Sequence, residues 1–332
     1  MNAESGQTKA KSGRRTLLLF IITSLAFGTA FVGIKAGLDD IPPILFAGFR
    51  YDIGAVVLLT YVYWRGGYWQ PRTRGDLIAV VVAGIFLSGL SATLLFLGQQ
   101  YLTTGTAAVI FSLVPVLAPL FALVLLPEER FGLVELVGIL LGLVGVVIIV
   151  GLNSLSNFGN STVRGVALVG GAAVAIAFGS VLLSRTDRSI SGLGMTAWAL
   201  LLAAGLVHSF SLLMGESPED ITPTIGALIA VLWVGLPATA LAFPSYYGLI
   251  DRAGPVRANL ISYTVPLVAT SVGAIALGEV ISVRTIFGFV VIVIGFALIE
   301  RQNIWCEILR LRGLPAPPEQ DDEHICECAP RG

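Results

Sequence analysis

Four ionisable side chains lie inside apolar stretches of the sequence, where a charge is costly. They are Lys35, Arg50, Asp52 and His208, and each lies in a run of apolar residues long enough to cross a bilayer. Ionisable groups in such runs usually belong to a binding site, a gate or a proton path. The chemistry they offer is attraction of an anionic solute by the two cations, and proton exchange at Asp52 or His208.

Each of the four also has a structural interpretation. Lys35 lies near the end of its run and can extend its stem to the interface, or lock a gate with the acidic pair Asp39–Asp40. Arg50 lies deeper, which favours a structural or gating ion pair. Asp52 is two residues from Arg50 and points to a different helix face, so we expect it to form a simple pair. For His208, a hydrogen bond between helices is the plainer alternative to a proton relay.

A second group of candidates is uncharged and surrounds two prolines within apolar runs. Proline removes a hydrogen bond from a helix and frees a carbonyl, and polar groups nearby can then face a water-filled cavity. Polar side chains at the ends of two further runs are expected at the two mouths of a solute pathway. These substrate-binding or gating candidates are Gln99, Gln100, Ser112, Pro115, Tyr246, Asn259, Ser262, Tyr263 and Pro266.

The two prolines belong to a segment that occurs twice in the chain. Other stretches repeat at nearly the same spacing, 151 residues for the earlier matches and 150 for the later ones. The matched pairs are Ala107–Pro115 with Ala258–Pro266, Ala26–Thr29 with Ala177–Ser180, Glu129 with Glu279, and Gly138 and Gly145 with Gly288 and Gly295. The sequence therefore predicts two copies of one unit.

The composition places these units in a membrane. Of the 332 residues, 55% are hydrophobic and 12% are charged, and the mean hydropathy is +0.87. Soluble domains carry about 25% charged residues, so this chain cannot cover a soluble surface. The net charge of −1 does not by itself point to any class of partner, and we expect no nucleic-acid partner. The three cysteines all follow residue 305, so no disulfide framework is expected, and no pattern calls for a metal or another cofactor.

The predicted fold is an all-α integral membrane protein with ten transmembrane helices. We divide the chain into an unstructured cytoplasmic tail (1–16), a first five-helix repeat (17–152), an external linker (153–162), a second repeat (163–300) and a cytoplasmic amphipathic segment with a disordered tail (301–332). The first span is expected to be retained and not cleaved as a signal peptide. The spans are 17–37, 44–64, 77–98, 105–126, 131–152, 163–183, 192–214, 224–248, 256–277 and 281–300.

The distribution of basic residues predicts the orientation of these spans. With the N-terminus in the cytoplasm, 16 of the 20 lysines and arginines fall in cytoplasmic segments and two, Arg164 and Arg284, fall outside. This satisfies the positive-inside rule and places both termini in the cytoplasm. Because each repeat has an odd number of spans, the second is inverted relative to the first. Inverted repeats are typical of secondary transporters, which bind solutes near the midplane between the halves.

Several motifs follow one another in an order that is specific to one family. An aromatic–glycine pair, Phe27-Gly28, precedes Lys35, then a proline after the turn and Arg50 early in the second span. This order resembles the EamA family of the drug/metabolite transporter superfamily over residues 17–300. The resemblance implies ten helices, an inverted repeat and transport of small metabolites, often amino acids. Two departures are Phe27, where many members have tryptophan, and Pro127-Glu128-Glu129 in place of Gly-Glu.

The sequence thus predicts a secondary transporter in the cell membrane that exports a small metabolite by alternating access. Its expected partners are the solute and membrane lipid, and a homo-oligomer is compatible with the sequence. The alternative is a polytopic membrane enzyme acting on a lipid or isoprenoid. Against an enzyme, the chain has no HExxH zinc pair, no GxSxG elbow and no cluster of acids suited to magnesium.

Overall fold

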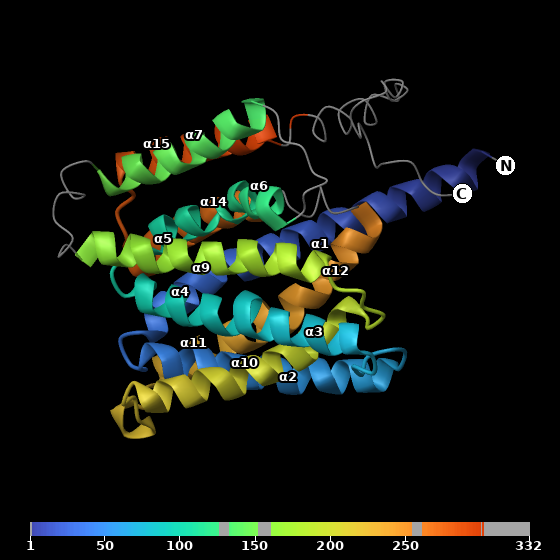
Figure 1. Cartoon of the computed structure of the whole chain (residues 1–332), viewed down its shortest axis with the longest axis horizontal. Coiled ribbons are helices and arrows are strands. Elements are labelled where there is room, and N and C mark those ends of the chain that lie inside the picture. Colours follow the sequence, from blue (N-terminus) through green and yellow to red (C-terminus); the bar gives the residue numbers. More distant parts are fainter. Residues whose placement is uncertain (1, 126–132, 152–160, 254–260, 300, 302–332) are drawn as a thin grey trace.

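The computed structural model describes residues 2–125, 133–151, 161–253, 261–299 and 301, and over these residues it is helical without strands. Figure 1 shows the helices running side by side along one direction. The elements in chain order are α1 (Asn2–Gly37), α2 (Pro43–Arg65), α3 (Arg74–Val82), η1 (Ala83–Leu90), α4 (Ser91–Gln99), α5 (Thr104–Phe111), α6 (Val114–Leu125), α7 (Leu133–Val150), α9 (Ser161–Ser184), α10 (Gly192–Leu213), η2 (Pro218–Asp220), α11 (Ile225–Gly235), η3 (Leu236–Leu241), α12 (Ala242–Ala253), α14 (Ile261–Leu277) and α15 (Val283–Ile299).

The helices have the length and composition of membrane spans. Seven helical stretches are long and apolar enough to cross a bilayer, and three shorter apolar helices lie at Leu136–Ile149, Ile261–Leu277 and Val283–Ile299. The shorter ones coincide with the predicted fifth, ninth and tenth spans. The all-helical, multi-pass prediction is confirmed, while the count of ten spans stays a prediction.

The N-terminal segment differs from our expectation. α1 begins at Asn2, so residues 2–16, which were predicted to be unstructured, continue the first helix. The membrane-spanning part begins at Arg15. Extending an existing helix avoids the cost of nucleation, and this segment contains alanine, glutamate and lysine, which favour helix. The basic residues of the predicted tail therefore lie on a helical extension.

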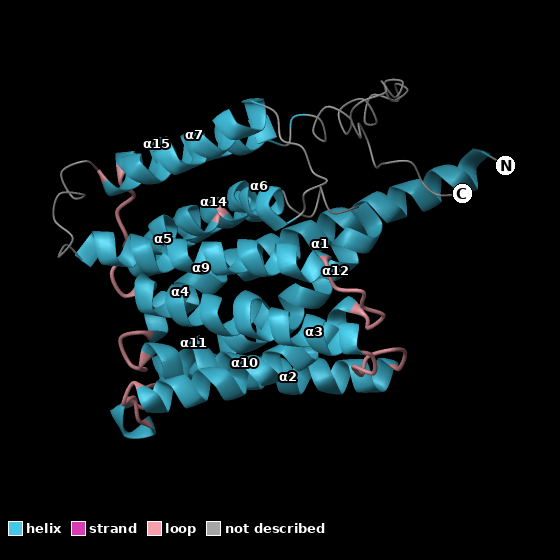
Figure 2. Ribbon diagram, in the orientation of Figure 1, coloured by secondary structure: helices cyan, strands magenta, loops and turns pink. Residues whose placement is uncertain are grey.

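Short polar residues set where the helices begin. Thr73, Thr103, Ser191 and Thr224 are the N-caps of α3, α5, α10 and α11, and each side chain accepts a hydrogen bond from a backbone N–H of the first turn. α2 begins instead with proline at its first position, where no N–H is needed. Figure 2 shows that the loops that connect these helices lie at two opposite ends of the bundle.

Three of the predicted spans are interrupted near their centres. π-helical segments occur in the third span, as η1, and in the eighth, as η3. The fourth span breaks between α5 and α6, because the proline at 115 has no N–H to bond to the Phe111 carbonyl. Interruptions of these kinds are where helices bend and where functional sites often lie.

Two helix pairs form opposite edges of the bundle. α7 packs on α15 at one edge, and α2 packs on α10 at the other, as Figure 1 shows at the top and bottom of the view. α1, α4–α6, α9, α11, α12 and α14 lie between them. At the first edge a Cβ on Gly138 would lie 2.5 Å from the Gly295 carbonyl oxygen, and a Cβ on Gly145 would lie 2.7 Å from that of Gly288. These glycines let two antiparallel backbones touch.

Candidate functional site

Arg50 is partly buried and reaches from α2 to the π-helical segment η3. Its Nε donates a hydrogen bond of 3.0 Å to Thr239 Oγ1. The guanidinium carbon lies 5.1 Å from the centre of the Tyr51 ring and 5.9 Å from that of Phe96, within the range of cation–π attraction. Within the described residues Arg50 forms no ion pair, so the predicted ion pair is replaced by a hydroxyl and two rings.

Lys35 closes the end of α4. Its ammonium donates to the carbonyl oxygens of Gln99 at 3.0 Å and Gln100 at 3.3 Å. Carbonyls in the last turn of a helix have no partner inside it and carry partial negative charge, so a cation is favourable there. The ammonium does not contact Asp39 or Asp40; Asp40 accepts a hydrogen bond from Thr224 instead. Lys35 therefore joins α1 to α4.

Gln99 is fully buried beside this contact. Its Nε2 donates to the Phe31 carbonyl oxygen, which joins α4 to α1 a second time. Its Oε1 has no hydrogen-bond partner among the described residues. Gln100 is exposed and donates back to Leu97 of its own helix. Of the two glutamines, Gln99 alone is placed inside the bundle.

Asp52 and His208 meet between α2 and α10. The His208 Nε2 and Asp52 Oδ2 atoms are 2.8 Å apart, and both side chains are half-buried. The Phe49 ring packs edge-on against the imidazole, with centroids 5.7 Å apart. A Cβ at Gly48 would overlap the imidazole, so this glycine makes room for it. The pair links the two helices of one edge.

The candidates near the two prolines are less exposed than the sequence suggested. Ser112 is buried and donates to the Val109 carbonyl oxygen of its own helix. Ser262 is half-buried, and the Tyr263 ring packs against Phe296 with centroids 4.4 Å apart. Tyr246 packs against Phe27. Of the two prolines, Pro266 is buried and Pro115 half-buried, and Asn259 lies outside the described residues.

Asp76 is a site residue that sequence reasoning missed. It is fully buried at the start of α3. One carboxylate oxygen accepts from the backbone N–H groups of Arg72 and Thr73 and from the Tyr68 hydroxyl. The other accepts from the N–H groups of Ser189 and Ile190, just before α10. Asp76 therefore ties the loop before α3 to the loop before α10.

The Tyr68 phenol shows the effect of this environment. Burial, together with the hydrogen bond to the Asp76 carboxylate, raises the pKa of Tyr68 above its ordinary value, so it stays protonated as the donor. The neighbouring residue Trp69 stacks on Trp198 with centroids 6.2 Å apart, and its carbonyl accepts from the Trp198 indole N–H. These contacts secure the end of the α2–α10 edge that we call the Asp76 end.

Glu216 joins α2 to α10 at the opposite end of the α2–α10 edge. Its carboxylate accepts from the N–H groups of Ile44 at 3.2 Å and Leu45 at 2.7 Å, in the first turn of α2. The Ser211 hydroxyl donates to it at 2.8 Å. A carboxylate satisfies the free N–H groups and the positive end of the helix dipole there. The α2–α10 edge is thus clamped at both ends.

Glu279 caps a third helix, at the same end of the bundle as Glu216. Both of its carboxylate oxygens lie 2.9 Å from the Thr104 N–H, and one accepts from the Thr104 hydroxyl. The turn before α15 is thereby joined to the start of α5. Glu129, its counterpart in the sequence, lies outside the described residues. We call this the Glu279 end of the bundle.

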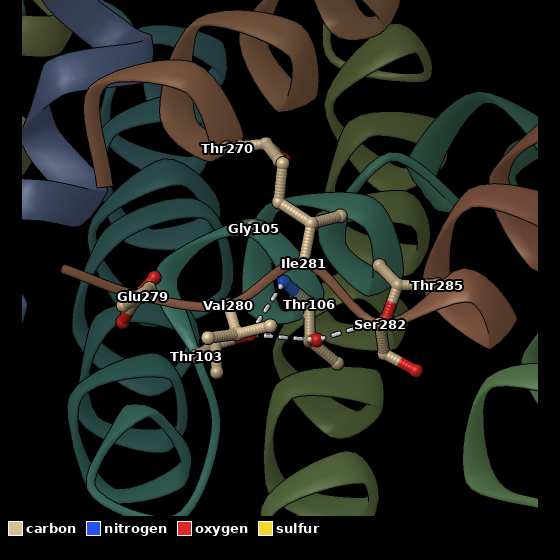
Figure 3. A pocket seen from close by; sticks show the side chains of 9 residues that line it. All are labelled: Thr103, Gly105, Thr106, Thr270, Glu279, Val280, Ile281, Ser282 and Thr285. Carbon is tan, nitrogen blue, oxygen red and sulfur yellow. Dashed lines mark hydrogen bonds between the residues drawn. The ribbon is translucent and has the colours of Figure 1, made fainter. Parts of the chain in front are cut away.

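A small recess lies beside this contact and is lined by hydroxyl groups. Figure 3 shows the side chain of Thr106, from α5, between those of Thr103, the N-cap residue of α5, and Thr285, from α15. The Thr103 and Thr106 hydroxyl oxygens are 2.8 Å apart, and those of Thr106 and Thr285 are 3.3 Å apart. A chain of hydroxyls therefore crosses from one repeat to the other. The available signal for the three carboxylate caps was an acidic residue in a loop, for Glu216 and Glu279, or in the first turn of a helix, for Asp76.

Comparison with known proteins gives one consistent result. The sequence profile of the EamA-like transporter family matches residues 14–151 and again residues 163–301. An uncharacterized transporter of Archaeoglobus fulgidus is 25% identical over 86% of this chain and 99% of its own length. The uncharacterized transporter YoaV of Bacillus subtilis is 26% identical over 85% and 95%. The uncharacterized inner membrane transporter YedA of Escherichia coli is 28% identical over 78% and 81%.

A solved crystal structure, described only as that of a protein, has a similar fold. It superimposes with a TM-score of 0.60 at 23% identity, over 86% of this chain and 96% of that one. At this identity the likeness concerns the fold alone.

Proposed function

The chain belongs to the EamA-like transporter family and is a multi-pass membrane transporter, and we propose that it exports a small metabolite by alternating access between two inverted repeats. The repeats are residues 17–152 and 163–300, and the two segments matched by the family profile support this division. The predicted orientation places both termini and the Asp76 end in the cytoplasm, and the Glu279 end outside.

The observation that carries this proposal is the reciprocity of contacts between the halves. Gly138 corresponds in sequence to Gly288, and Gly145 to Gly295, yet Gly138 contacts Gly295 and Gly145 contacts Gly288. Crossed contacts of this kind arise when two equivalent helices are related by a two-fold axis. The inner helices also make reciprocal contacts between the halves. α1 of the first half packs on α14 of the second, and α9 of the second half packs on α5 and α6 of the first.

The carboxylate clamps suggest which parts move. Asp76 and Glu216 hold the α2–α10 edge at both ends, so we propose that this edge stays closed throughout the cycle. The halves then rock around a central pathway between the fourth and ninth spans, whose walls are completed by the first, third, sixth and eighth. Bends at Pro115, Pro266 and the π-helical segments η1 and η3 permit this motion.

The groups proposed to meet or gate the solute come from these inner helices. Polar side chains and freed carbonyls near the two prolines supply hydrogen bonds, and Lys35 and Arg50 supply charge. Asn259 keeps its proposed role from its sequence position alone. The full proposed set is Lys35, Arg50, Gln99, Gln100, Ser112, Pro115, Tyr246, Asn259, Ser262, Tyr263 and Pro266.

Flux measured in proteoliposomes tests the proposed function. Purified protein is reconstituted and supplied with labelled amino acids, nucleobases and related metabolites, and empty vesicles serve as the control. We expect protein-dependent flux of at least one solute. Absence of flux for every solute, combined with turnover of a lipid substrate, would instead favour the membrane enzyme.

For the Asp52–His208 pair we propose a structural role at the closed edge and not a proton relay. Replacing Asp52 with asparagine removes the charge and weakens the contact. We expect the free energy of unfolding to fall by about 1 kcal/mol, because the pair is half-exposed. Thermal unfolding measures this loss, with Asp39→Asn, in an exposed turn, as the control. If the variant folds normally but its flux loses the pH dependence of the wild type, the relay is correct.

A further inference from the structure

We propose that the Arg50 guanidinium binds the carboxylate of a small organic acid that this protein transports. The site is bounded by Thr239 and by the rings of Tyr51 and Phe96. The inference rests on the proposed transport function and adds to it the chemical class of the solute.

The depth of the guanidinium is the first argument. Its partner Thr239 lies inside Ile225–Tyr246, an apolar helical stretch long enough to cross a bilayer. The hydrogen bond from Arg50 Nε to Thr239 Oγ1 therefore holds the charge inside that stretch and away from both of its ends. At this depth the side chain is not extended to the interface, and a cation there is costly and usually functional.

The unused hydrogen-bonding capacity of Arg50 is the second argument. A guanidinium is charged at all relevant pH values and has five N–H donors. Among the described residues only Nε has a partner. The two terminal nitrogens have none, and neither is completely buried. The four N–H donors of these two nitrogens thus have no partner among the described residues.

The third argument is that the Asp52 carboxylate does not neutralise the charge of Arg50. Asp52, the nearest acidic residue in the sequence, points to α10 and is engaged by His208. Lys35, the other cation within a span, donates to two carbonyl oxygens. Of these two cations within spans, Arg50 is therefore the one that has no anionic or carbonyl partner among the described residues.

The geometry of the guanidinium favours a carboxylate as its partner. Two parallel N–H groups of a guanidinium match the two oxygens of a carboxylate, which gives a planar, bidentate contact. The fully buried ring of Phe96 and the buried ring of Tyr51 flank the site. Benzoate carries one carboxylate on a rigid apolar ring, so it is a suitable probe, and benzamide is its neutral match.

Chemical protection tests the site without knowledge of the natural solute. Purified wild-type protein in lipid nanodiscs is treated with phenylglyoxal, which modifies accessible guanidinium groups, and the rate at each arginine is followed by mass spectrometry. We expect Arg50 to react, and saturating benzoate to slow its reaction by about tenfold or more. Benzamide should have no such effect.

Arg164 provides the control within the same molecule. It also lies over a tyrosine ring, 5.1 Å from the centre of Tyr101, but it is exposed in the first turn of α9. Its reaction should not respond to benzoate. The proposal is overturned if Arg50 stays unmodified while Arg164 reacts, or if benzoate and benzamide affect Arg50 equally. Protection reports binding and not transport, so a protein with flux but no protection would refute the carboxylate site and leave the transporter proposal standing.

Discussion

Replacing Gly138 with alanine is expected to lower the free energy of unfolding by about 1–3 kcal/mol, the usual cost of overfilling a packed contact. The new Cβ would lie 2.5 Å from the Gly295 carbonyl oxygen and 2.7 Å from a side-chain carbon of Ile299. The carbonyl belongs to the backbone and cannot move aside without displacing α15. The α7–α15 edge must therefore separate, and its other close contact, between Gly145 and Gly288, is weakened with it.

Thermal unfolding of the purified variant in nanodiscs measures this loss. The matched control is Gly205→Ala in α10, where a Cβ would meet no atom within 4 Å. Alanine favours helix over glycine by about 1 kcal/mol, so the control should be as stable as the wild type or more stable. If Gly138→Ala melts at or above the temperature of Gly205→Ala, the two backbones do not touch as described.

The all-helical, multi-pass character of the fold could be predicted from the sequence because bilayer crossing leaves a strong signal. Apolar runs with few charges located the helices, and the internal matches paired Gly138 with Gly288 and Gly145 with Gly295 as equivalent positions. Which glycine touches which could not be derived in the same way. That depends on how the two copies dock, and the crossed contacts follow only when the packing is known.

The sequence was a poorer guide to the site. Asp52 and His208 were each recognised as unusual, but their pairing joins residues 156 apart in the chain. Asp76 and Glu216 were overlooked as binding groups because each binds backbone N–H groups of the other repeat, Asp76 in the loop before α10 and Glu216 in the first turn of α2. The π-helical segments have no clear local signature either. In η3 the bond from Thr239 Oγ1 to the Val234 carbonyl oxygen belongs to an irregular turn that depends on its surroundings.

A disulfide between α5 and α15 is expected to stop transport, which would be the largest effect on activity that the structure predicts. The Thr106 and Thr285 hydroxyl oxygens are 3.3 Å apart, so cysteines at these positions can come within bonding distance after a small adjustment. α5 belongs to the first repeat and α15 to the second, and Glu279 joins them nearby. In the proposed cycle these elements separate when the Glu279 end opens, and a disulfide prevents this.

A second cysteine pair provides the control for the cross-link itself. The Tyr68 carbonyl oxygen accepts a hydrogen bond of 3.0 Å from the Ser191 N–H, at the edge that Asp76 clamps. Because we propose that this edge stays closed, Tyr68→Cys with Ser191→Cys should form a disulfide and keep its flux. The native Cys306, Cys326 and Cys328 are replaced by serine in both proteins, so that only the intended pair can be oxidised.

The most direct test is therefore the flux of a transported solute in proteoliposomes containing the Thr106→Cys/Thr285→Cys protein, before oxidation, after oxidation and after reduction. Alternating access predicts that oxidation lowers flux by about tenfold or more, in proportion to the cross-linked fraction, and that reduction restores it. Flux at the wild-type rate in the fully cross-linked protein would show that the Glu279 end does not open during transport, and would contradict the proposed mechanism.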